Sequence, residues 1–369
     1  MKASLVIPTY NSRHLLEACL ISLNHQSVAE GDSFEVLLVD DGSTDGTGEM
    51  VQKLEIDYDL RYLFKPRTPE SCRSAARNLG IGKAEGDVVV MVDGDQVLAP
   101  DFMAEHLRAH RDRTDLVVIG YRVYLEPGVV DLDALRRGFS LDALPPVASR
   151  DERETIMEKV SQNLHNMATR WHFLYGCNVS VRREHLLAVG GFDEAFKRWS
   201  FEDVELGYRL HLRGLVFVHH PYAILYHQHH EHSAVRQYAD WRENFAHFTA
   251  KHRQPEVACQ WILDRSFNPE DNELTWTDVY LRLEYAVRAL QGRLPMTGPV
   301  RALQVTDDPR GALRGITERA QEGHLLVVDR TDDRDLPLLV QAVPSPHELF
   351  YFKEADPTAA AALIDQYTA

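Results

Sequence analysis

The run Val88-Val89-Val90-Met91-Val92-Asp93-Gly94-Asp95 leads from an unbroken apolar segment directly into two carboxylates that one glycine separates. Such a segment is typical of a parallel strand that is covered on both faces. A second apolar segment, Leu37-Leu38-Val39, leads in the same way into the acidic turn Asp40-Asp41-Gly42-Ser43-Thr44-Asp45. Because helix-period segments separate such strands, the sequence predicts right-handed βαβ units and a doubly wound sheet.

The expected fold class is therefore α/β, with a mixed, mainly parallel sheet that helices flank. Ligands bind such sheets at the carboxyl ends of the strands, so both acidic turns are expected on one rim. We expect strands at residues 3–8, 35–40, 87–92, 116–123, 173–181, 216–219 and 223–226. We expect helices at residues 12–26, 46–54, 72–84, 100–110, 183–189 and 202–213.

The chain has 369 residues, more than one average domain, and we predict three parts. Residues 1–235 form the main domain, in which an excursion at about 125–170, with a helix at 151–169, covers the substrate. Residues 236–295 form a helical extension. Residues 296–369 form a small α/β appendage of unknown role, with strands at 301–305 and 324–329 around a helix at 309–321.

Composition narrows the possible partners. The chain carries 56 acidic and 40 basic residues, a formal net charge of -16, which argues against nucleic acid as the main partner. A nucleotide is still compatible with this charge, because a divalent cation can bridge carboxylates and phosphate. The 44% hydrophobic content is sufficient for a sizeable core without stabilising cross-links.

Cysteine usage and the apolar segments indicate a compartment. The cysteines, four in number, are scattered and include no CxxC pair, so buried free thiols in a reducing compartment are expected. The apolar run before Pro8 is too short for a signal peptide, and no apolar run approaches the length of a membrane span. We therefore expect a cytoplasmic protein without an integral membrane segment.

Each acidic turn has a functional and a structural interpretation. Carboxylates at a strand tip can accept hydrogen bonds from a nucleobase or a ribose, yet Asp, Gly and Ser also form ordinary solvated turns. Asp93 and Asp95 can bind Mg²⁺ or Mn²⁺ while a diphosphate fills the other positions. The residues alone leave both interpretations open.

Two later clusters carry further candidate chemistry. Glu202-Asp203 begins a predicted helix, where the helix dipole alone favours acids, but an ionised carboxylate there also suits a general base. Trp199 and Phe201 precede this pair and could form the floor of a sugar site. The histidine-dense segment at residues 219–232 could add imidazole to the carboxylates and favour Mn²⁺, although spacing alone selects none of its histidines.

Together these residues resemble the inverting, GT-A fold (Rossmann-like) family 2 glycosyltransferases. The resemblance covers about residues 3–232 with its motifs in consistent order. The first motifs are Val6-Ile7-Pro8-Thr9-Tyr10-Asn11, Val39–Asp45, Ala76-Arg77-Asn78-Leu79-Gly80 and the DxD motif Val92-Asp93-Gly94-Asp95. Residues 176–183, 190–194 and 201–210, with Tyr226-His227-Gln228, are similar to the galactosyltransferase C-terminal segment of chondroitin-polymerase-like and polypeptide-modifying transferases.

The resemblance implies a hexosyltransferase-class enzyme that uses a nucleotide-sugar donor. Pro8, Tyr10 and Asp41 should contact the nucleobase and ribose, and Arg77 should lie near the diphosphate. UDP is the nucleotide that the family favours, with GDP and TDP as alternatives. The implied acceptors are a growing glycan, a lipid-linked or surface carbohydrate, a peptide side chain or a small natural product.

The resemblance also implies a metal site and a catalytic base. Asp93 and Asp95 should bracket ribose and Mn²⁺ or Mg²⁺, with Asp95 the firmer metal ligand and His227 completing the site. Asp203 should be the base of a single displacement that inverts the anomeric carbon, and Glu202 should bind the acceptor or the sugar.

The chain departs from the family pattern in two places. The usual Trp-Gly-Gly before the acidic pair is Trp199-Ser200-Phe201 here, so a different acceptor pocket is expected. The C-terminal unit resembles no familiar part of the family, and it is the expected surface for any homo-oligomer.

Two functions other than sugar transfer are alternatives for this sequence. A nucleotidyltransferase also combines a doubly wound sheet with metal carboxylates, but its glycine-rich signature is replaced here by Pro8-Thr9-Tyr10-Asn11-Ser12. A non-catalytic nucleotide- or sugar-binding module would be expected to lack part of the constellation, whereas Asp93, Asp95, Asp203 and His227 are all present.

Overall fold

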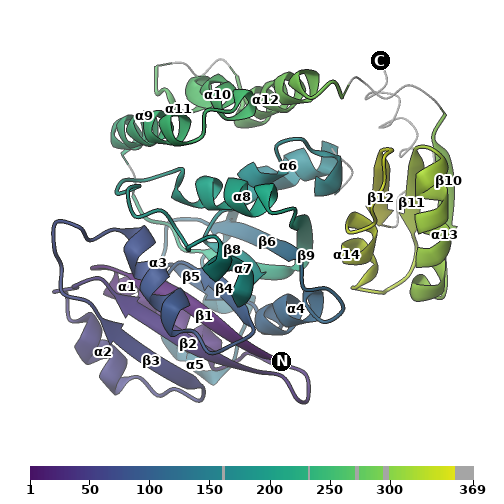
Figure 1. The fold of residues 1–369 in the computed structure, drawn as a ribbon. Coiled ribbons are helices and arrows are strands. Elements are labelled where there is room, and N and C mark those ends of the chain that lie inside the picture. Colours follow the sequence, from purple (N-terminus) through teal and green to yellow (C-terminus); the bar gives the residue numbers. More distant parts are fainter. Residues whose placement is uncertain (160–162, 232, 271–273, 294–298, 354–369) are drawn as a thin grey trace. The chain divides into compact units, whose positions relative to one another are not determined.

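A computed structural model describes residues 1–159, 163–231, 233–270, 274–293 and 299–353 of the protein (Figure 1). The chain divides into two compact units. Unit 1 comprises Met1–Asp151, Trp171–Leu215 and His220–Lys251. Unit 2 comprises Glu152–Arg170, Val216–His219 and the part of the chain from His252 onward.

The larger sheet is mixed. Its strands run in the order β3-β2-β1-β4-β8-β6-β9-β5, and β7 pairs with β6 outside this path. The strands β3, β2, β1 and β4 are parallel, whereas β8 is antiparallel to both β4 and β6. The strands are β1 (Lys2–Thr9), β2 (Ser33–Asp40), β3 (Asp59–Phe64), β4 (Val88–Val92), β5 (Gln96–Leu98), β6 (Leu116–Leu125), β7 (Val147–Arg150), β8 (Asn178–Arg182) and β9 (Val216–His227). This architecture confirms the predicted fold class.

Helices cover both faces of the parallel strands, which explains their continuous apolar runs. One face packs Leu5 and Val90 against α1 (Arg13–Leu23) and α4 (Phe102–Ala109). The other face receives α3 (Arg73–Lys83) at a very short distance, because a Cβ on Gly80 would lie 2.4 Å from Cγ1 of Val6. A glycine is therefore required at this helix–strand contact.

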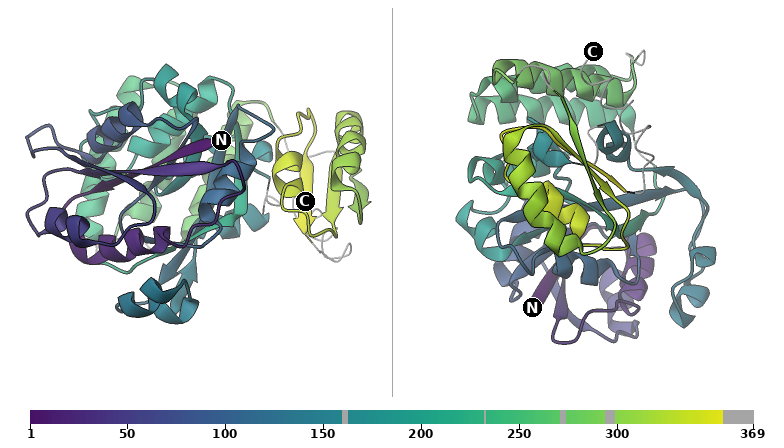
Figure 2. Two further views of the ribbon diagram at one scale, coloured as in Figure 1. Left: turned by 90° about the horizontal axis from the view of Figure 1, so that it is seen from below. Right: turned by 90° about the vertical axis from the view of Figure 1, so that its right-hand side faces the viewer.

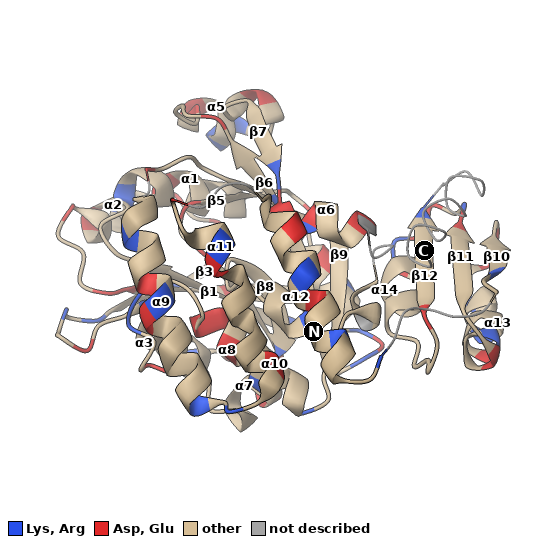
Figure 3. Ribbon diagram, turned by 90° about the horizontal axis from the view of Figure 1, so that it is seen from above, with Lys and Arg blue, Asp and Glu red and all other residues tan. Residues whose placement is uncertain are grey.

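The residues of the excursion predicted at 125–170 are divided between the two units. Between β6 and β7 the chain forms α5 (Leu132–Arg137) and the short 3-10 helix η1 (Leu141–Ala143), and these elements project from the end of β6 (Figure 3). Residues Glu152–Arg170 belong to unit 2, and this segment begins with α6 (Glu152–Lys159). The predicted helix at 151–169 is thus too long: residues 160–162 lie outside the described part, and Leu164–Asn166 form the 3-10 helix η2.

Unit 1 contains four further α-helices and one 3-10 helix in its described residues. They are α2 (Thr47–Lys53), α7 (Arg183–Ala188), α8 (Glu202–Leu212) and α9 (Ala234–Lys251), and the 3-10 helix η3 (Arg170–Phe173) begins at the boundary with unit 2. Asp95 precedes β5, and β5 pairs antiparallel with β9 so that Gln96 lies opposite His227. This pairing brings the histidine segment to the DxD motif.

Unit 2 contains a helical group and a small parallel sheet. The helical elements are α10 (Pro255–Ala258), η4 (Cys259–Leu263), α11 (Asp264–Phe267) and α12 (Trp276–Leu290). The sheet has the order β10-β11-β12, with β10 (Arg301–Val305), β11 (Leu325–Asp329), β12 (Leu349–Lys353) and the helices α13 (Pro309–Glu322) and α14 (Leu336–Gln341) (Figure 2). Ile316 and Val340 pack on this sheet and give it a core of its own.

The structure confirms the predicted strands and helix of this C-terminal α/β unit. The domain boundaries after residues 235 and 295, and a homo-oligomer through the C-terminal region, stay predictions. None of the helices in the described ranges is both long and apolar enough to cross a membrane.

Several strands differ from the sequence prediction. β3 was missed because charged residues interrupt its apolar pattern, and β5 was missed because it has only three residues. The strand expected at 173–181 begins only at Asn178, after η3. The two strands expected at 216–219 and 223–226 are one strand, β9, that continues through Pro221. Proline is tolerated in a strand where its missing N–H is not needed for the ladder.

Candidate active site

The loops after β1 and β2 form the first part of the site. Asn11 joins the two loops: its backbone N–H donates to Oγ of Ser43 at 2.9 Å, and its side-chain oxygen accepts from the backbone N–H of Thr44 at 2.8 Å. Asn11 has a φ of 49°, a left-handed conformation that asparagine tolerates better than most residues. Pro8 lies on β1 opposite Val39 of β2. The nucleobase residues expected from the sequence therefore lie on adjacent strand ends.

Two basic side chains bind the carboxylate of Asp41, which is predicted to contact the nucleobase. Asp41 is buried and accepts from Nζ of Lys65 at 2.8 Å and from Nη1 of Arg67 at 2.7 Å. The guanidinium carbon of Arg67 also lies 3.7 Å from the ring centre of Tyr10, which is 45% exposed. Arg67 thus joins Asp41 and Tyr10. Both cations follow strand β3, whose interrupted apolar pattern hides it in the sequence, so neither was predicted.

A carboxylate and two imidazoles form a candidate metal centre. Asp95, His227 and His230 each offer a ligand atom, and these atoms all lie within 4.8 Å of one another. Oδ2 of Asp95 is 3.0 Å from Nε2 of His230 and 3.6 Å from Nε2 of His227. One carboxylate oxygen with two imidazole nitrogens is a donor set that suits a transition metal such as Mn²⁺ better than Ca²⁺. These residues therefore fit the metal that the sequence implies.

The electrostatics of this centre depend on the shared carboxylate. The hydrogen bond to Asp95 raises the pKa of His230, whereas burial lowers the pKa of His227. Burial opposes ionisation of Asp95, but the hydrogen bond from His230 and the nearby charge of His227 outweigh it and lower the pKa of Asp95 to about 2. His230 was not predicted, because its only signal in the sequence is its place in a histidine-dense segment.

Arg77 connects the DxD motif to the acidic pair. Its side chain is 1% exposed, and Nη2 donates to Oδ1 of Asp93 at 2.8 Å and to the carbonyl of Gly176 at 3.3 Å. Its Nη1 lies 3.5 Å from Oε1 of Glu202. A Cβ on Gly176 would approach the guanidinium carbon to 2.8 Å, so this contact requires glycine. Asp93 is therefore hydrogen-bonded to Arg77, and it is not part of the candidate metal centre of Asp95, His227 and His230.

A second arginine lies beside the same carboxylate. Arg73 is one helical turn before Arg77 on α3, and its Nη1 lies 3.3 Å from Oε1 of Glu202. Its side chain is 47% exposed, in contrast to the buried Arg77. Arg73 was not predicted as a site residue, because it lies outside the Ala76-Arg77-Asn78 motif.

The acidic pair occupies the first turn of α8. Oδ2 of Asp203 accepts from the backbone N–H of Gly176 at 3.1 Å, and Oδ1 accepts from the N–H of Val204 at 2.8 Å. Burial and the charge of Glu202 raise the pKa of Asp203 to about 6. Glu202 is buried, and its Oε2 has no hydrogen-bond partner among the described residues. A carboxylate with this pKa is mostly ionised at neutral pH and still basic enough to accept a proton.

The loop before the acidic pair corrects one expectation. Phe201 is 1% exposed and its ring packs against Trp241, Phe245 and Phe248 of α9, so it does not form the floor of a sugar site. Ser200 and Phe201 have φ values of 78° and 66°, in the left-handed region. That conformation costs a residue other than glycine about 1–2 kcal/mol. The two residues thus keep a glycine-like backbone at the positions of the family's glycine pair.

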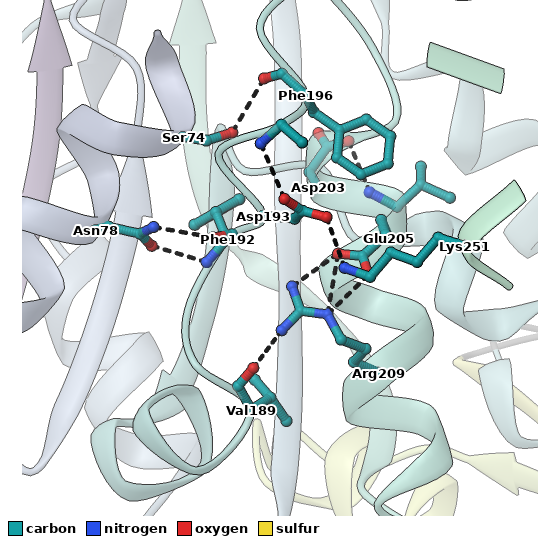
Figure 4. A network of polar contacts seen from close by, with 12 residues as sticks. Ser74, Asn78, Val189, Phe192, Asp193, Phe196, Asp203, Glu205, Arg209 and Lys251 are labelled. Carbon is teal, nitrogen blue, oxygen red and sulfur yellow. Dashed lines mark hydrogen bonds and ion pairs between the residues drawn. The ribbon is translucent and has the colours of Figure 1, made fainter. Parts of the chain in front are cut away.

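Polar contacts also explain two of the recognised motifs (Figure 4). The Asn78 amide pairs with the backbone of Phe192: Nδ2 donates to the carbonyl at 2.9 Å, and Oδ1 accepts from the N–H at 2.7 Å. A Cβ on Gly191 would lie 2.4 Å from Oδ1 of Asn78, so the glycine leaves room for this pairing. The motifs at residues 76–80 and 190–194 therefore connect α3 with the loop before α8.

The fold and the site define an α/β enzyme with paired carboxylates and a candidate metal centre at the rim of its sheet. Residues 4–189 match the model of glycosyl transferase family 2. Residues 158–233 match the model described as the N-terminal domain of galactosyltransferase. The chain belongs to glycosyl transferase family 2 and is a glycosyltransferase. This assignment favours sugar transfer over the nucleotidyltransferase and the non-catalytic module.

Individual relatives agree with the family. The chain is 31% identical to the uncharacterized glycosyltransferase YfnE of Bacillus subtilis, over 77% of this chain and 79% of that protein. It is 30% identical to the chondroitin synthase of Pasteurella multocida, over 61% of this chain but only 24% of that longer protein. Among solved structures, the mannosyltransferase PcManGT from Pyrobaculum calidifontis, in complex with GDP-Man and Mn²⁺, superimposes with a TM-score of 0.49 at 17% identity, over 86% of this chain and 79% of that one.

Proposed function

We propose that this glycosyltransferase moves a sugar from a nucleotide-sugar donor, a UDP-sugar first of all, to a hydroxyl group of an acceptor with inversion at the anomeric carbon. The observation that carries the proposal is the position of Arg77, whose buried guanidinium contacts Asp93 on one side and Glu202 on the other. The DxD carboxylates and the acidic pair are thereby parts of one site. A donor bound at the strand ends would then lie next to a candidate base.

The donor would bind at the ends of β1, β2 and β4. Tyr10 and Pro8 offer a surface for the nucleobase, and Asp41 offers a carboxylate for a base N–H or a ribose hydroxyl. Asp93 is the second ribose candidate. Lys65 and Arg67 form ion pairs with Asp41. A bound nucleobase would therefore find a hydrogen-bond acceptor, the Asp41 carboxylate, next to two hydrogen-bond donors, Lys65 and Arg67.

Asp95, His227 and His230 would hold Mn²⁺ or Mg²⁺, with Mn²⁺ favoured by the two imidazoles. The ion would supply positive charge to the diphosphate as it leaves. Arg73, which remains partly exposed beside Glu202, is a cation of the chain itself that can add to this charge.

Asp203 would accept the proton of the acceptor hydroxyl as its oxygen forms a bond to the anomeric carbon. The bond from that carbon to the diphosphate oxygen breaks in the same step, so the configuration inverts. Glu202 would orient the acceptor or the sugar, since its Oε2 is buried and unpartnered among the described residues. The acceptor is a carbohydrate, a peptide or a small molecule in this proposal.

We also propose that the enzyme works in a reducing, cytoplasmic compartment. The free thiols of Cys19, Cys72 and Cys177 are buried, as expected of cysteines that form no disulfides.

A donor hydrolysis screen tests the proposal without an acceptor. UDP-, GDP- and TDP-sugars would be incubated with the enzyme and Mn²⁺, and released nucleotide would be measured. Release from one nucleotide sugar that chelation abolishes is the expected result, and the anomer transferred or released would be identified by NMR. Hydrolysis of none, together with no metal-dependent binding of UDP or GDP by calorimetry, would refute the proposed function.

A further inference from the structure

The loop at residues 198–201 holds an unusual conformation directly before the acidic pair. Ser200 and Phe201 follow one another with φ values of 78° and 66°, and neither is glycine. Non-glycine residues stay in this region only where the surrounding structure holds them there. Something outside the loop must therefore fix its backbone.

The aromatic face of α9 holds the side chain of Phe201. The ring centre of Phe201 is 5.6 Å from that of Trp241, 5.9 Å from Phe245 and 5.4 Å from Phe248. These three residues recur at helical spacing, so they lie on one face of α9. We call this group, with Phe201, the aromatic clamp.

Asn244, on the same helix, holds the backbone of the loop. Its Nδ2 lies 3.2, 3.1 and 2.7 Å from the carbonyl oxygens of Arg198, Trp199 and Ser200. Asn244 is buried, and its amide group donates to the carbonyls of this loop. One side chain thereby orients three consecutive peptide groups.

The C-terminal end of α9 is also fixed to the neighbourhood of the acidic pair. Nζ of Lys251 lies 2.7 Å from Oδ2 of Asp193 and 2.8 Å from Oε1 of Glu205, which is on α8 (Figure 4). The helix therefore has contacts both with the loop and with the helix that the loop begins.

The loop conformation determines where α8 starts. The carbonyl of Phe201 accepts the N–H of Glu205 at 2.8 Å, which is a first-turn hydrogen bond of the helix. Asp203 lies within this turn, and its carboxylate reaches the N–H of Gly176 at 3.1 Å. A rotation of the Phe201 peptide would therefore move the Asp203 carboxylate away from Gly176.

We propose that Phe201 and Asn244 are positioning residues that fix the carboxylate of Asp203 in the active site. The inference rests on the proposed function, in which Asp203 is the base. It adds that α9 determines turnover through this loop, without contact with the donor. A base displaced by about 1 Å can lose on the order of 10²-fold in rate.

Two variants separate positioning from folding. Asn244→Asp keeps the shape of the side chain but replaces the NH2 group with an oxygen, which repels the three carbonyls. Phe201→Gly removes the Phe201 ring from the aromatic clamp, but glycine adopts the left-handed conformation without strain. The free energy of unfolding should therefore fall less than the loss of a buried ring suggests. Phe102→Leu, at the buried first residue of α4, is the control for a general loss of packing.

The measurements are hydrogen exchange of the peptide at 198–206, and kcat and KM for the nucleotide sugar that the wild-type enzyme hydrolyses. In both variants we expect exchange at 198–206 to accelerate about tenfold or more. We expect kcat to fall between about tenfold and 10²-fold while the donor KM stays within about twofold, because α9 does not touch the donor. Phe102→Leu should change neither exchange at 198–206 nor kcat.

The opposite outcomes overturn the inference. Unchanged exchange at 198–206 in both variants, an unchanged kcat in spite of faster exchange, or equal losses in Phe102→Leu would each show that the clamp does not position the base. Failure of the proposed function has a different signature: full activity of Asp203→Asn would refute the base, whatever the clamp variants do.

Discussion

The two halves of the site are held in different ways. On the donor side, Asp41 and Asp95 lie at the ends of strands, and short-range turns with nearby cations or histidines fix them. On the acidic-pair side, Asp203 begins a helix behind a left-handed loop, and the distant helix α9 holds that loop. Changes on the donor side should therefore weaken binding of nucleotide and metal. Changes on the acidic-pair side should lower turnover.

The largest expected effect tests the acidic-pair side alone. Asp203→Asn removes the proton acceptor but keeps the shape of the side chain and one oxygen that can accept from the N–H of Gly176, so kcat should fall by about 10²–10⁴-fold. Binding of UDP and Mn²⁺, measured by calorimetry, should be unchanged. A matching loss of nucleotide binding would mean that the two halves are not separate.

The next effect belongs to the donor side. His230→Ala removes one imidazole from the candidate metal group, and the affinity for Mn²⁺ should fall by about 10–100-fold in calorimetric titration. His229→Ala is the matched control, because this neighbouring histidine is exposed and outside the group. Equal effects of the two variants would contradict the assignment of His230.

A smaller effect is expected where the two halves meet. Gly176→Ala places a methyl group against the guanidinium of Arg77, so the free energy of unfolding should fall by about 1–3 kcal/mol. Gly82→Ala, in the open on α3, should instead stabilise the protein by about 0.5–1 kcal/mol. Urea denaturation of both variants provides the comparison, and a neutral Gly176→Ala would show that Arg77 is free to move.

The smallest expected effect concerns two buried histidines that contact β8. Burial lowers the pKa of His106 and of His110 to about 3, and both rings contact Oγ of Ser180 on β8. Below the ordinary histidine pKa near 6.5 the unfolded chain binds protons that the folded chain does not. Stability should therefore decrease as the pH falls below about 6.5, by about 1 kcal/mol per histidine over the first pH unit.

Denaturation at pH 7.0 and pH 5.5 would measure this dependence. His106→Gln should make it less steep, because one of the buried neutral rings is removed. The same slope in the variant and the wild type would assign the pH dependence to other groups.

The sequence predicted the two halves to different extents. Asp41, Asp93 and Asp95 could be located because a strand that is buried on both faces leaves a continuous apolar run before its polar end. Lys65 and Arg67 could not, because they follow an edge strand with interrupted apolar pattern. His230 could not be separated from its neighbours, since a dense group of histidines has no period that shows which one turns inward.

The acidic-pair side was harder because its geometry depends on long-range packing. The Trp-Ser-Phe departure was visible in the sequence, yet nothing local indicates that the Phe201 ring is buried under α9. Asn244 has no motif at all, and its role depends on three carbonyls that lie more than forty residues earlier. The roles of the catalytic, nucleotide and metal residues stay predictions that the variants above test.

The aromatic clamp has an evolutionary consequence. With a non-glycine residue at position 201, the loop depends on Asn244 and on the aromatic face of α9, so loss of either is harmful while Phe201 is present. A substitution of Phe201 by glycine would relax this dependence and allow α9 to change. The order in which these positions can mutate is therefore restricted, and Phe201 and α9 are expected to change together among descendants of this chain.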